Sequence, residues 1–400
     1  MIGSLLFSCT SNRNANSNEG EEFPKTIVFD EAAPEEIASE EDDTAEVQAV
    51  STASQNTIRV ALLLDTSSSM DGLIEQAKSQ LWKIVNQLAL AKKGEDYANI
   101  LIALYEYGND GINSETGYVR QVVELTDDLD KLSEELFALS TNGGSENCGQ
   151  VIAKSLDELA WEKETAGLQV MFIAGNEPFT QGRVNYEKAC TDATGSDIIV
   201  NTIYCGDNAQ GISEKWKHGA DLTDGFYGSI EMNETTVYIE TPFDDQIEAL
   251  NAKLNDTYLA FGSQKDYYKS NQTRQDNNSS LYGRENVVER TITKSSHVYK
   301  NATWDLVDAI DQEDFDVTKV ETKDLPDEMK EMTDAEKIAY VELKANQREK
   351  IQQEIKALGV KRADYIAQKQ EESGEGSNGL DYAMMKAIKE QAEAKNFIFN

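Results

Sequence analysis

Short apolar runs alternate with amphipathic segments over the first half of the chain, and this alternation limits the possible folds more than any other feature. The apolar runs have the length of buried strands, and the segments between them, such as 72–92, carry apolar residues at helical spacing. Near-continuous apolar strands separated by helices are typical of a mainly parallel sheet covered on both faces. We therefore predict a doubly wound α/β domain. Its predicted strands are 58–65, 98–108, 118–125, 168–176, 197–206 and a short run at 226–231.

An Asp and a cluster of serines follow the first predicted strand, in the stretch VALLLDTSSSMDG (60–72). In doubly wound folds, ligands bind at the carboxyl ends of the strands, so this loop lies where such folds place their sites. The alternate spacing of Asp65, Ser67 and Ser69 lets one carboxylate and two hydroxyls converge on one point. Oxygen donors of this kind suit a hard cation such as Mg²⁺. The alternative is that Asp65 and Ser67 cap the helix that starts near Asp71.

This strand, loop and helix resemble the metal-ion-dependent adhesion site (MIDAS) of von Willebrand factor A (VWA) domains, and residues 57–262 follow the order of elements in that family. The resemblance implies a mainly parallel six-stranded sheet with helices on both faces. It also implies that Asp65, Ser67 and Ser69 bind a metal. The cofactor would be Mg²⁺ or another hard divalent cation such as Mn²⁺ or Ca²⁺.

The family's second metal-binding loop contributes a hydroxyl after paired glycines, and STNGGSEN (140–147) corresponds to it. The resemblance assigns Ser145 to that position, with Thr141 as a second candidate and Glu146 as a source of added negative charge. The alternative is a glycine-rich connection without a role in metal binding.

The third loop departs from the family pattern. VWA domains usually close their fourth strand with T-D-G, whose Asp supports the metal, whereas this chain has Gly175 and Asn176 in FIAGNEPFTQG. We expect the missing carboxylate to weaken metal binding unless Asn176 or Glu177 takes its place. The alternative is that Asn176, Glu177 and Pro178 form only a turn.

The resemblance implies a binding protein rather than an enzyme. An incompletely coordinated cation can accept a carboxylate from a protein or other macromolecular partner. Two histidines in the whole chain, His218 and His297, and the lack of a second acidic metal cluster argue against a hydrolase. The formal net charge of −36 argues against nucleic-acid binding, because phosphates would be repelled.

The amino terminus, MIGSLLFSCTSN, resembles the lipobox of bacterial lipoproteins. The resemblance implies that 1–9 is a truncated signal and that Cys9 carries lipid. Residues 10–56 are rich in Asp and Glu with few apolar residues, which predicts a flexible tether. We therefore expect a protein anchored to a bacterial membrane in the cell envelope, facing outside the cytoplasm. The other three cysteines are expected to be buried thiols.

The last third of the chain is predicted to be a polar linker at 263–283 followed by a helical region at 284–400. Thr333 and Glu336 form a capping-box pattern at the start of a long helix, in which Gly359 could be a hinge or kink. Together with FIAGNEPFTQG and VNTIYCG, WDLVDAI (304–310) resembles a bacterial VWA subgroup with a C-terminal helical extension. These helices either pack back on the domain or dock to a partner. In the second case the protein would be a scaffold or assembly component whose helices make the partner contact, and the metal site would be structural or vestigial.

Overall fold

The computed structural model describes residues 55–163, 165–231, 238–373 and 379–399. They all belong to one compact unit, Gln48–Asn400. The predicted lipidation site Cys9 and the tether up to residue 54 lie outside the described residues. Among the described helices, none combines the length and the apolar character needed to span a bilayer.

A six-stranded sheet forms the centre of the unit, and all of its neighbouring strands are parallel except the antiparallel pair β4 and β5. The predicted fold class is therefore confirmed. Across the sheet, the strands are β5 (Val119–Thr126), β4 (Asn99–Tyr107), β1 (Thr57–Asp65), β6 (Leu168–Gly175), β7 (Ile199–Cys205) and β8 (Tyr227–Ile230). A second, three-stranded sheet consists of β3 (Asp96–Tyr97), β2 (Ala91–Lys93) and β9 (Ile398–Phe399).

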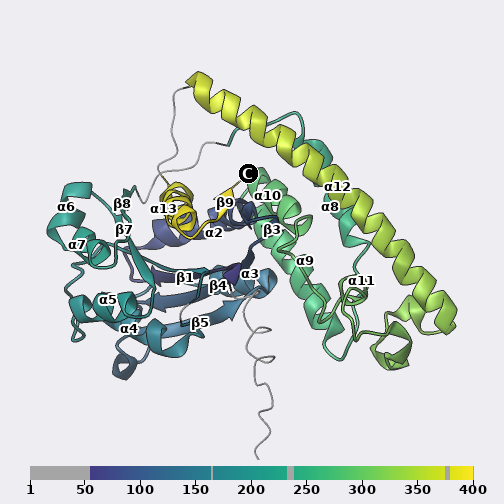
Figure 1. Ribbon diagram of the computed structural model, residues 1–400, viewed down its shortest axis with the longest axis horizontal. Coiled ribbons are helices and arrows are strands. Elements are labelled where there is room, and N and C mark those ends of the chain that lie inside the picture. Colours follow the sequence, from purple (N-terminus) through teal and green to yellow (C-terminus); the bar gives the residue numbers. More distant parts are fainter. Residues whose placement is uncertain (1–54, 164, 232–237, 374–378, 400) are drawn as a thin grey trace, which may run out of the picture. The chain divides into compact units, whose positions relative to one another are not determined.

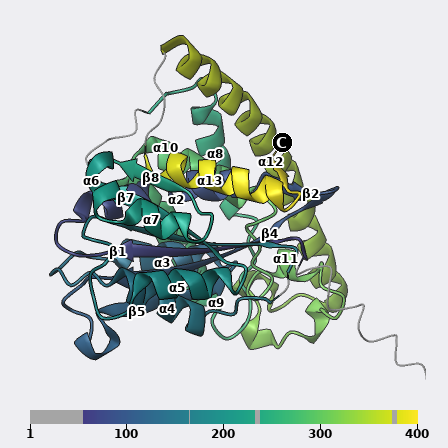
Figure 2. The same ribbon diagram turned by 60° about the vertical axis from the view of Figure 1, so that its left-hand side comes forward.

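Helices cover both faces of the six-stranded sheet, as Figures 1 and 2 show for α2 and α13 on one face and α4 and α5 on the other. Alternate residues of a strand point to opposite faces. Accordingly, Val60 and Leu62 of β1 belong to one apolar core and Ala61 and Leu63 to the other. The first core includes α2 (Asp71–Leu88), α3 (Leu129–Ala138) and α13 (Leu380–Ala394). The second includes α4 (Cys148–Glu158), α5 (Tyr186–Thr194) and α7 (Trp216–Asp221), and the short α6 (Asn208–Ser213) precedes α7.

Helix α13 reaches the sheet from the far end of the sequence. It packs against α2 and against strands β6, β7 and β8. Its side chains Leu380, Met384 and Ile388 are buried in the same core as Leu62 and Phe172. The last helix therefore packs back on the domain, and the predicted range 57–262 lacks one of the helices that cover its sheet.

The segment between β8 and α13 is mainly helical. Its longer helices are α8 (Asp244–Asn255), α9 (Lys265–Leu281), α10 (Arg284–Lys294) and α12 (Asp334–Ser373). Its short elements are α11 (Leu306–Ala309) and the 3₁₀ turns η2 (Val317–Lys319), η3 (Thr322–Asp324) and η4 (Asp327–Met329), and a further turn, η1 (Ser114–Thr116), precedes β5.

The predicted linker was wrong. Residues 263–283 contain helix α9, whose side chains Gln275 and Ser279 are buried and satisfied, since Ser133 donates a hydrogen bond to Gln275 and Trp82 donates one to Ser279. Helix α8 ends at Asn255. Beyond it, the hydroxyl of Thr257 donates to the carbonyl of Leu254 at 2.6 Å, and the chain turns.

The long helix α12 begins as predicted, because the hydroxyl of Thr333 and the backbone of Thr333 both bond the carboxylate of Glu336. It continues without interruption through Gly359, so the predicted hinge is absent from this helix. Its buried side chains lie three, four or seven residues apart, as expected for one packed face of a helix. They are Lys337, Val341, Arg348, Ile355, Leu358 and Arg362.

Candidate functional site

The first loop lies at the carboxyl end of β1, a central strand between β4 and β6. The Asp65 side chain is fully buried, and its Oδ1 accepts a hydrogen bond from the Ser67 N–H at 2.7 Å. Its other oxygen, Oδ2, is buried and has no hydrogen-bond partner among the described residues. Helix α2 starts after Met70 without any side-chain cap, so the capping alternative is wrong. One oxygen of Asp65 shapes the turn and the other is available to a ligand.

The two predicted hydroxyls come together beside Asp65. The Oγ atoms of Ser67 and Ser69 are 3.2 Å apart, and the amide nitrogen of Asn176 lies 3.3 Å from Ser69 Oγ. Thr66 is directed elsewhere, because its hydroxyl donates to Glu106 Oε2 at 3.2 Å. The structure therefore brings Asn176 of the third loop onto the first loop, while the side chain of Glu177 is exposed.

The second loop is joined to the first by backbone hydrogen bonds, from Asn142 N–H to the Thr66 carbonyl and from Ser68 N–H to the Gly143 carbonyl, both 2.9 Å long. Thr141 is engaged away from the site, since its hydroxyl donates to the Asp71 carboxylate. Ser145 forms a β-bridge with Gly108, next to Asp65.

Glu146 follows Ser145 and is 3% exposed, and its Oε2, like Asp65 Oδ2, is buried without a partner among the described residues. Two glycines leave the space that these carboxylates occupy. A Cβ on Gly108 would lie 2.8 Å from both Asp65 Oδ1 and Glu146 Cγ, and a Cβ on Gly175 would lie 3.0 Å from Asp65 Oδ2. Sequence reasoning noted Gly175 only as a departure from the family motif and did not identify Gly108, because the closeness of both glycines to Asp65 depends on the pairing of strands.

These donors fit a hard divalent cation. Two buried carboxylate oxygens lack a partner, hydroxyls lie beside one of them, and neither sulfur nor imidazole is among the donors. Within the described ranges, no group of three or more His, Cys, Asp or Glu side chains is placed to hold a metal. A cation at this position would therefore depend on hydroxyl and water oxygens as well as on carboxylates.

The electrostatic setting of Asp65 is unfavourable for a bare carboxylate. Burial raises the pKa of Asp65 to about 7. Hydrogen bonds from Ser67 and from the backbone of Asn176 oppose the rise in this pKa, and the negative charge of Glu177 adds to it. A nearby cation would favour the ionised form.

The three cysteines of the domain are free buried thiols, as predicted. Burial raises the pKa of each, to about 12 for Cys190, so they are protonated and poorly reactive. The histidines are not part of the site, since His218 Nδ1 bonds the Tyr186 hydroxyl and the His297 ring stacks on Tyr97.

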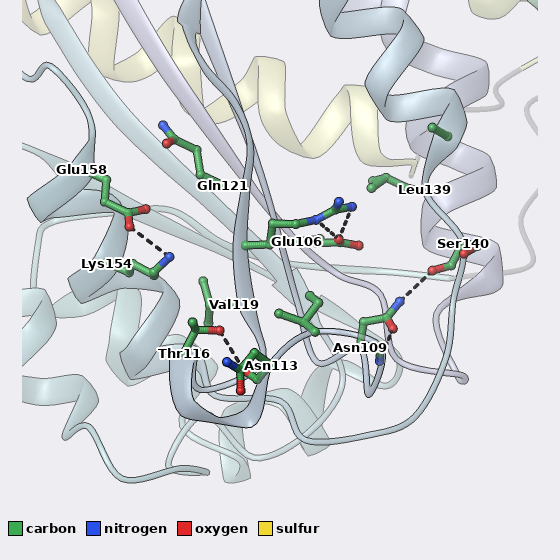
Figure 3. A pocket seen from close by; sticks show the side chains of 14 residues that line it. Glu106, Asn109, Asn113, Thr116, Val119, Gln121, Leu139, Ser140, Lys154 and Glu158 are labelled. Carbon is green, nitrogen blue, oxygen red and sulfur yellow. Dashed lines mark hydrogen bonds and ion pairs between the residues drawn. The ribbon is translucent and has the colours of Figure 1, made fainter.

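An open pocket of about 620 Å³ lies beside the edge strand β5 (Figure 3). Its walls include two ion pairs, Arg120 with Glu106 and Lys154 with Glu158. Because Glu106 also accepts the hydroxyl of Thr66, one wall of the pocket is bonded to the first loop. Sequence reasoning missed this pocket because its lining comes from several separated segments.

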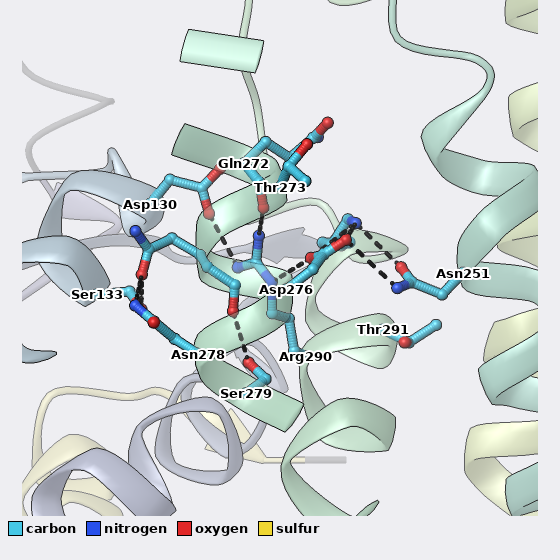
Figure 4. A network of polar contacts seen from close by, with 12 residues as sticks. Asp130, Ser133, Asn251, Gln272, Thr273, Asp276, Asn278, Ser279, Arg290 and Thr291 are labelled. Atoms are coloured by element: carbon cyan, nitrogen blue, oxygen red, sulfur yellow. Dashed lines mark hydrogen bonds and ion pairs between the residues drawn. The ribbon is translucent and has the colours of Figure 1, made fainter. Parts of the chain in front are cut away.

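A buried polar network joins α3 to α9 and α10 (Figure 4). Arg290, 1% exposed, pairs with both Asp130 and Asp276, and Lys294 contacts Asp276 Oδ2 at 3.0 Å. Its charges are matched within the network, so it is a structural link rather than a ligand site.

Residues 60–216 match the von Willebrand factor type A domain, and the α/β part of this chain has the fold of that family. The match covers less than half of the chain. VWA domains generally mediate protein–protein interactions and bind metals. No curated protein matches the sequence.

Several solved structures are similar to parts of the chain. The conserved hypothetical protein BatB from Bacteroides thetaiotaomicron is 14% identical, with a TM-score of 0.33 over 44% of this chain and 90% of that chain. The VWA domain of SpRpn10 is 16% identical, with a TM-score of 0.35 over 45% of this chain and 90% of that chain. Proximal thread matrix protein 1 from the mussel byssus, solved with zinc in its MIDAS motif, is 12% identical. Its TM-score is 0.35 over 45% of this chain and 43% of that chain.

Proposed function

We propose that this chain is a non-enzymatic binding protein whose VWA domain holds a hard divalent cation, Mg²⁺ being the first candidate, at Asp65, Ser67 and Ser69. Through the cation it would bind a carboxylate of a protein partner. The observation that carries the proposal is the buried Asp65 carboxylate at the end of a central strand, whose Oδ2 has no hydrogen-bond partner among the described residues and whose loop brings the hydroxyls of Ser67 and Ser69 together. Such an oxygen is costly to bury unless something charged or polar meets it.

The residues around the first loop would divide the work of binding. Asp65 would supply negative charge from a buried position, and the buried Ser67 and the exposed Ser69 would supply neutral hydroxyl oxygens. Asn176, in the third loop, donates a hydrogen bond to Ser69. Ser145, in the second loop, is bridged to Gly108. When bound, the cation would offer open coordination positions to water or to the partner's carboxylate.

The proposal extends to the location of the protein. Cys9 would carry lipid, the acidic segment 10–56 would be the tether, and the VWA domain would act outside the cytoplasm of a bacterial cell. The sequence pattern of the amino terminus supports this part. The strongly negative net charge opposes acidic partners at long range, so recognition would depend on short-range coordination.

Metal titration of wild type and Asp65→Ala tests the proposal. A ligand at about 100 times its Kd adds about 2.7 kcal/mol to the free energy of unfolding. We expect Mg²⁺ to stabilise the wild type in urea unfolding and to leave Asp65→Ala unchanged. The control is Asp110→Ala, because Asp110 is exposed and lies against Gly143 of the second loop. Equal Mg²⁺ affinity in wild type and Asp65→Ala would contradict the proposal.

The same variants distinguish the second candidate, a scaffold that binds through its C-terminal helices. Its support is that α12 exposes apolar side chains, with Leu343 51% and Val360 58% exposed. A partner captured from membranes should be lost with EDTA and with Asp65→Ala if the metal site binds it. Capture that persists in both cases favours the scaffold. Deleting 281–400 is not a usable test, because it would remove α13 from the core.

A further inference from the structure

We propose that Glu146 supplies the second carboxylate of the metal site and replaces the acidic residue that the third loop lacks. This inference rests on the proposed function and deepens it. It assigns a residue of the second loop to a task that the third loop cannot perform, because Gly175 and Asn176 stand there.

The position of Glu146 supports the assignment. Its side chain is 3% exposed, and its carboxylate lies in a space walled by glycines. A Cβ on Gly108 would meet Glu146 Cγ and Asp65 Oδ1 at the same distance, 2.8 Å, so the two buried acidic side chains pack against the same side of Gly108. Glu146 Oε1 lies 3.5 Å from where Gly144 would carry a Cβ. Larger residues at Gly108 would close the space between the two carboxylates.

Two carboxylate oxygens beside Gly108 and Gly175 are available to bind a cation. Asp65 Oδ2 and Glu146 Oε2 are buried acceptors that form no hydrogen bond of normal geometry among the residues the structure describes, although the backbone N–H of Asn176 faces the Asp65 carboxylate. Two carboxylates that share a buried space repel each other, and each loses its hydration there. A divalent cation relieves both effects at once, whereas a lone monovalent partner would neutralise only one charge.

Glu146 is also held in place by its neighbours. Ser145 forms the bridge with Gly108, and Asn147, at the start of α4, donates through Nδ2 to the Gly117 carbonyl at 2.9 Å. The backbone on both sides of Glu146 is therefore fixed by these contacts. Glu177, the alternative acid from the third loop, has an exposed side chain and lacks this arrangement.

Mg²⁺ titration of Glu146→Gln, Glu177→Gln and Asp65→Asn beside the wild type tests the inference, by calorimetry and by urea unfolding with and without the metal. We expect Glu146→Gln to weaken Mg²⁺ binding by about tenfold or more, because affinity follows the number of charged ligands. Glu177→Gln is the comparison from the third loop and should weaken Mg²⁺ binding less than Glu146→Gln does, because the Glu177 side chain is exposed and acts on Asp65 only through its charge. Without metal, Glu146→Gln should be at least as stable as the wild type, because it removes the repulsion between the carboxylates.

The outcomes separate the two claims. If the wild type binds Mg²⁺, Asp65→Asn does not, and Glu146→Gln binds like the wild type, the inference fails and the proposed function stands. If the wild type shows no metal binding, the proposed function fails as well. Loss of the fold in metal-free Glu146→Gln, seen by circular dichroism, would also overturn the inference, since the carboxylate would then be needed by the fold.

Discussion

Single buried arginines connect the helical layers of this molecule. Arg290, Arg348 and Arg362 are each at most 3% exposed, and each pairs with two acidic side chains. Removing one partner of such a buried pair typically destabilises a protein, because the other charge remains without compensation. The buried ionic residues therefore fix how the helices meet.

The Asp276 carboxylate gives a prediction that depends on pH. Burial would raise its pKa, but the charges of Arg290 and Lys294 outweigh burial and hold the pKa of Asp276 well below its ordinary value. The folded state then binds fewer protons than the unfolded state in acid, so this stabilisation is complete above the ordinary range and is lost as the pH falls. We expect Asp276→Asn to lower the free energy of unfolding by about 3 kcal/mol at pH 7.

This difference from the wild type should shrink as the pH falls below about 4, where an ordinary Asp takes up its proton. Urea unfolding at a series of pH values measures it. The control is Asp245→Asn, because Asp245 pairs with Arg284 at the surface and is 88% exposed. A difference between wild type and Asp276→Asn that stays constant down to pH 3 would argue against a lowered pKa.

At the scale of residues, the sequence predicted the first loop well because Asp65, Ser67 and Ser69 are local neighbours, and their closeness follows from spacing. It predicted Glu146 only as added charge, because its closeness to Asp65 depends on Gly108 of the β4–β5 connection. Thr141 was a reasonable candidate by spacing, but it bonds Asp71.

At the scale of elements, the six strands could be predicted because their apolar runs are nearly continuous, and observed and predicted bounds differ by a few residues. Helix α9 could not, because its buried side chains are amides and hydroxyls whose partners lie on other elements. A composition rich in Asn and Gln indicates exposure unless those partners are known. The place of α13 depends on a contact across the whole sequence, which local periodicity does not contain.

Helix α13 should behave as part of the domain core. Ile388→Ala leaves a cavity against the sheet, and we expect it to lower the free energy of unfolding by about 2–5 kcal/mol. Tyr382→Ala, on the same helix but 50% exposed, is the control and should have little effect. Urea unfolding followed by tryptophan fluorescence measures both. A separate early transition that reports only on α13, with the main transition unchanged, would show that the helix docks independently of the core.

At the scale of the whole molecule, the proposed membrane anchor and the proposed metal site are expected to function independently. Replacing Cys9 by Ser removes the proposed acylation site, so we expect the protein to move from the membrane fraction to the soluble fraction. Mg²⁺ affinity should not change, because Cys9 is not among the proposed ligands. Fractionation of cells that express the full chain measures the first effect, with Ser8→Ala as control. A Cys9→Ser protein that stays in the membrane fraction would rule out this anchor.

The packing of α13 on the sheet also has a consequence for folding during synthesis. On the order of 150 residues separate β8 from α13, and a ribosome that adds roughly 5–20 residues per second needs about ten seconds or more to make them. During that interval the apolar face of the sheet that α13 will cover is exposed to water. A nascent chain with this exposed surface is expected to bind chaperones. A premature stop codon shortly before residue 380 would yield a fragment that aggregates rather than a shorter folded domain.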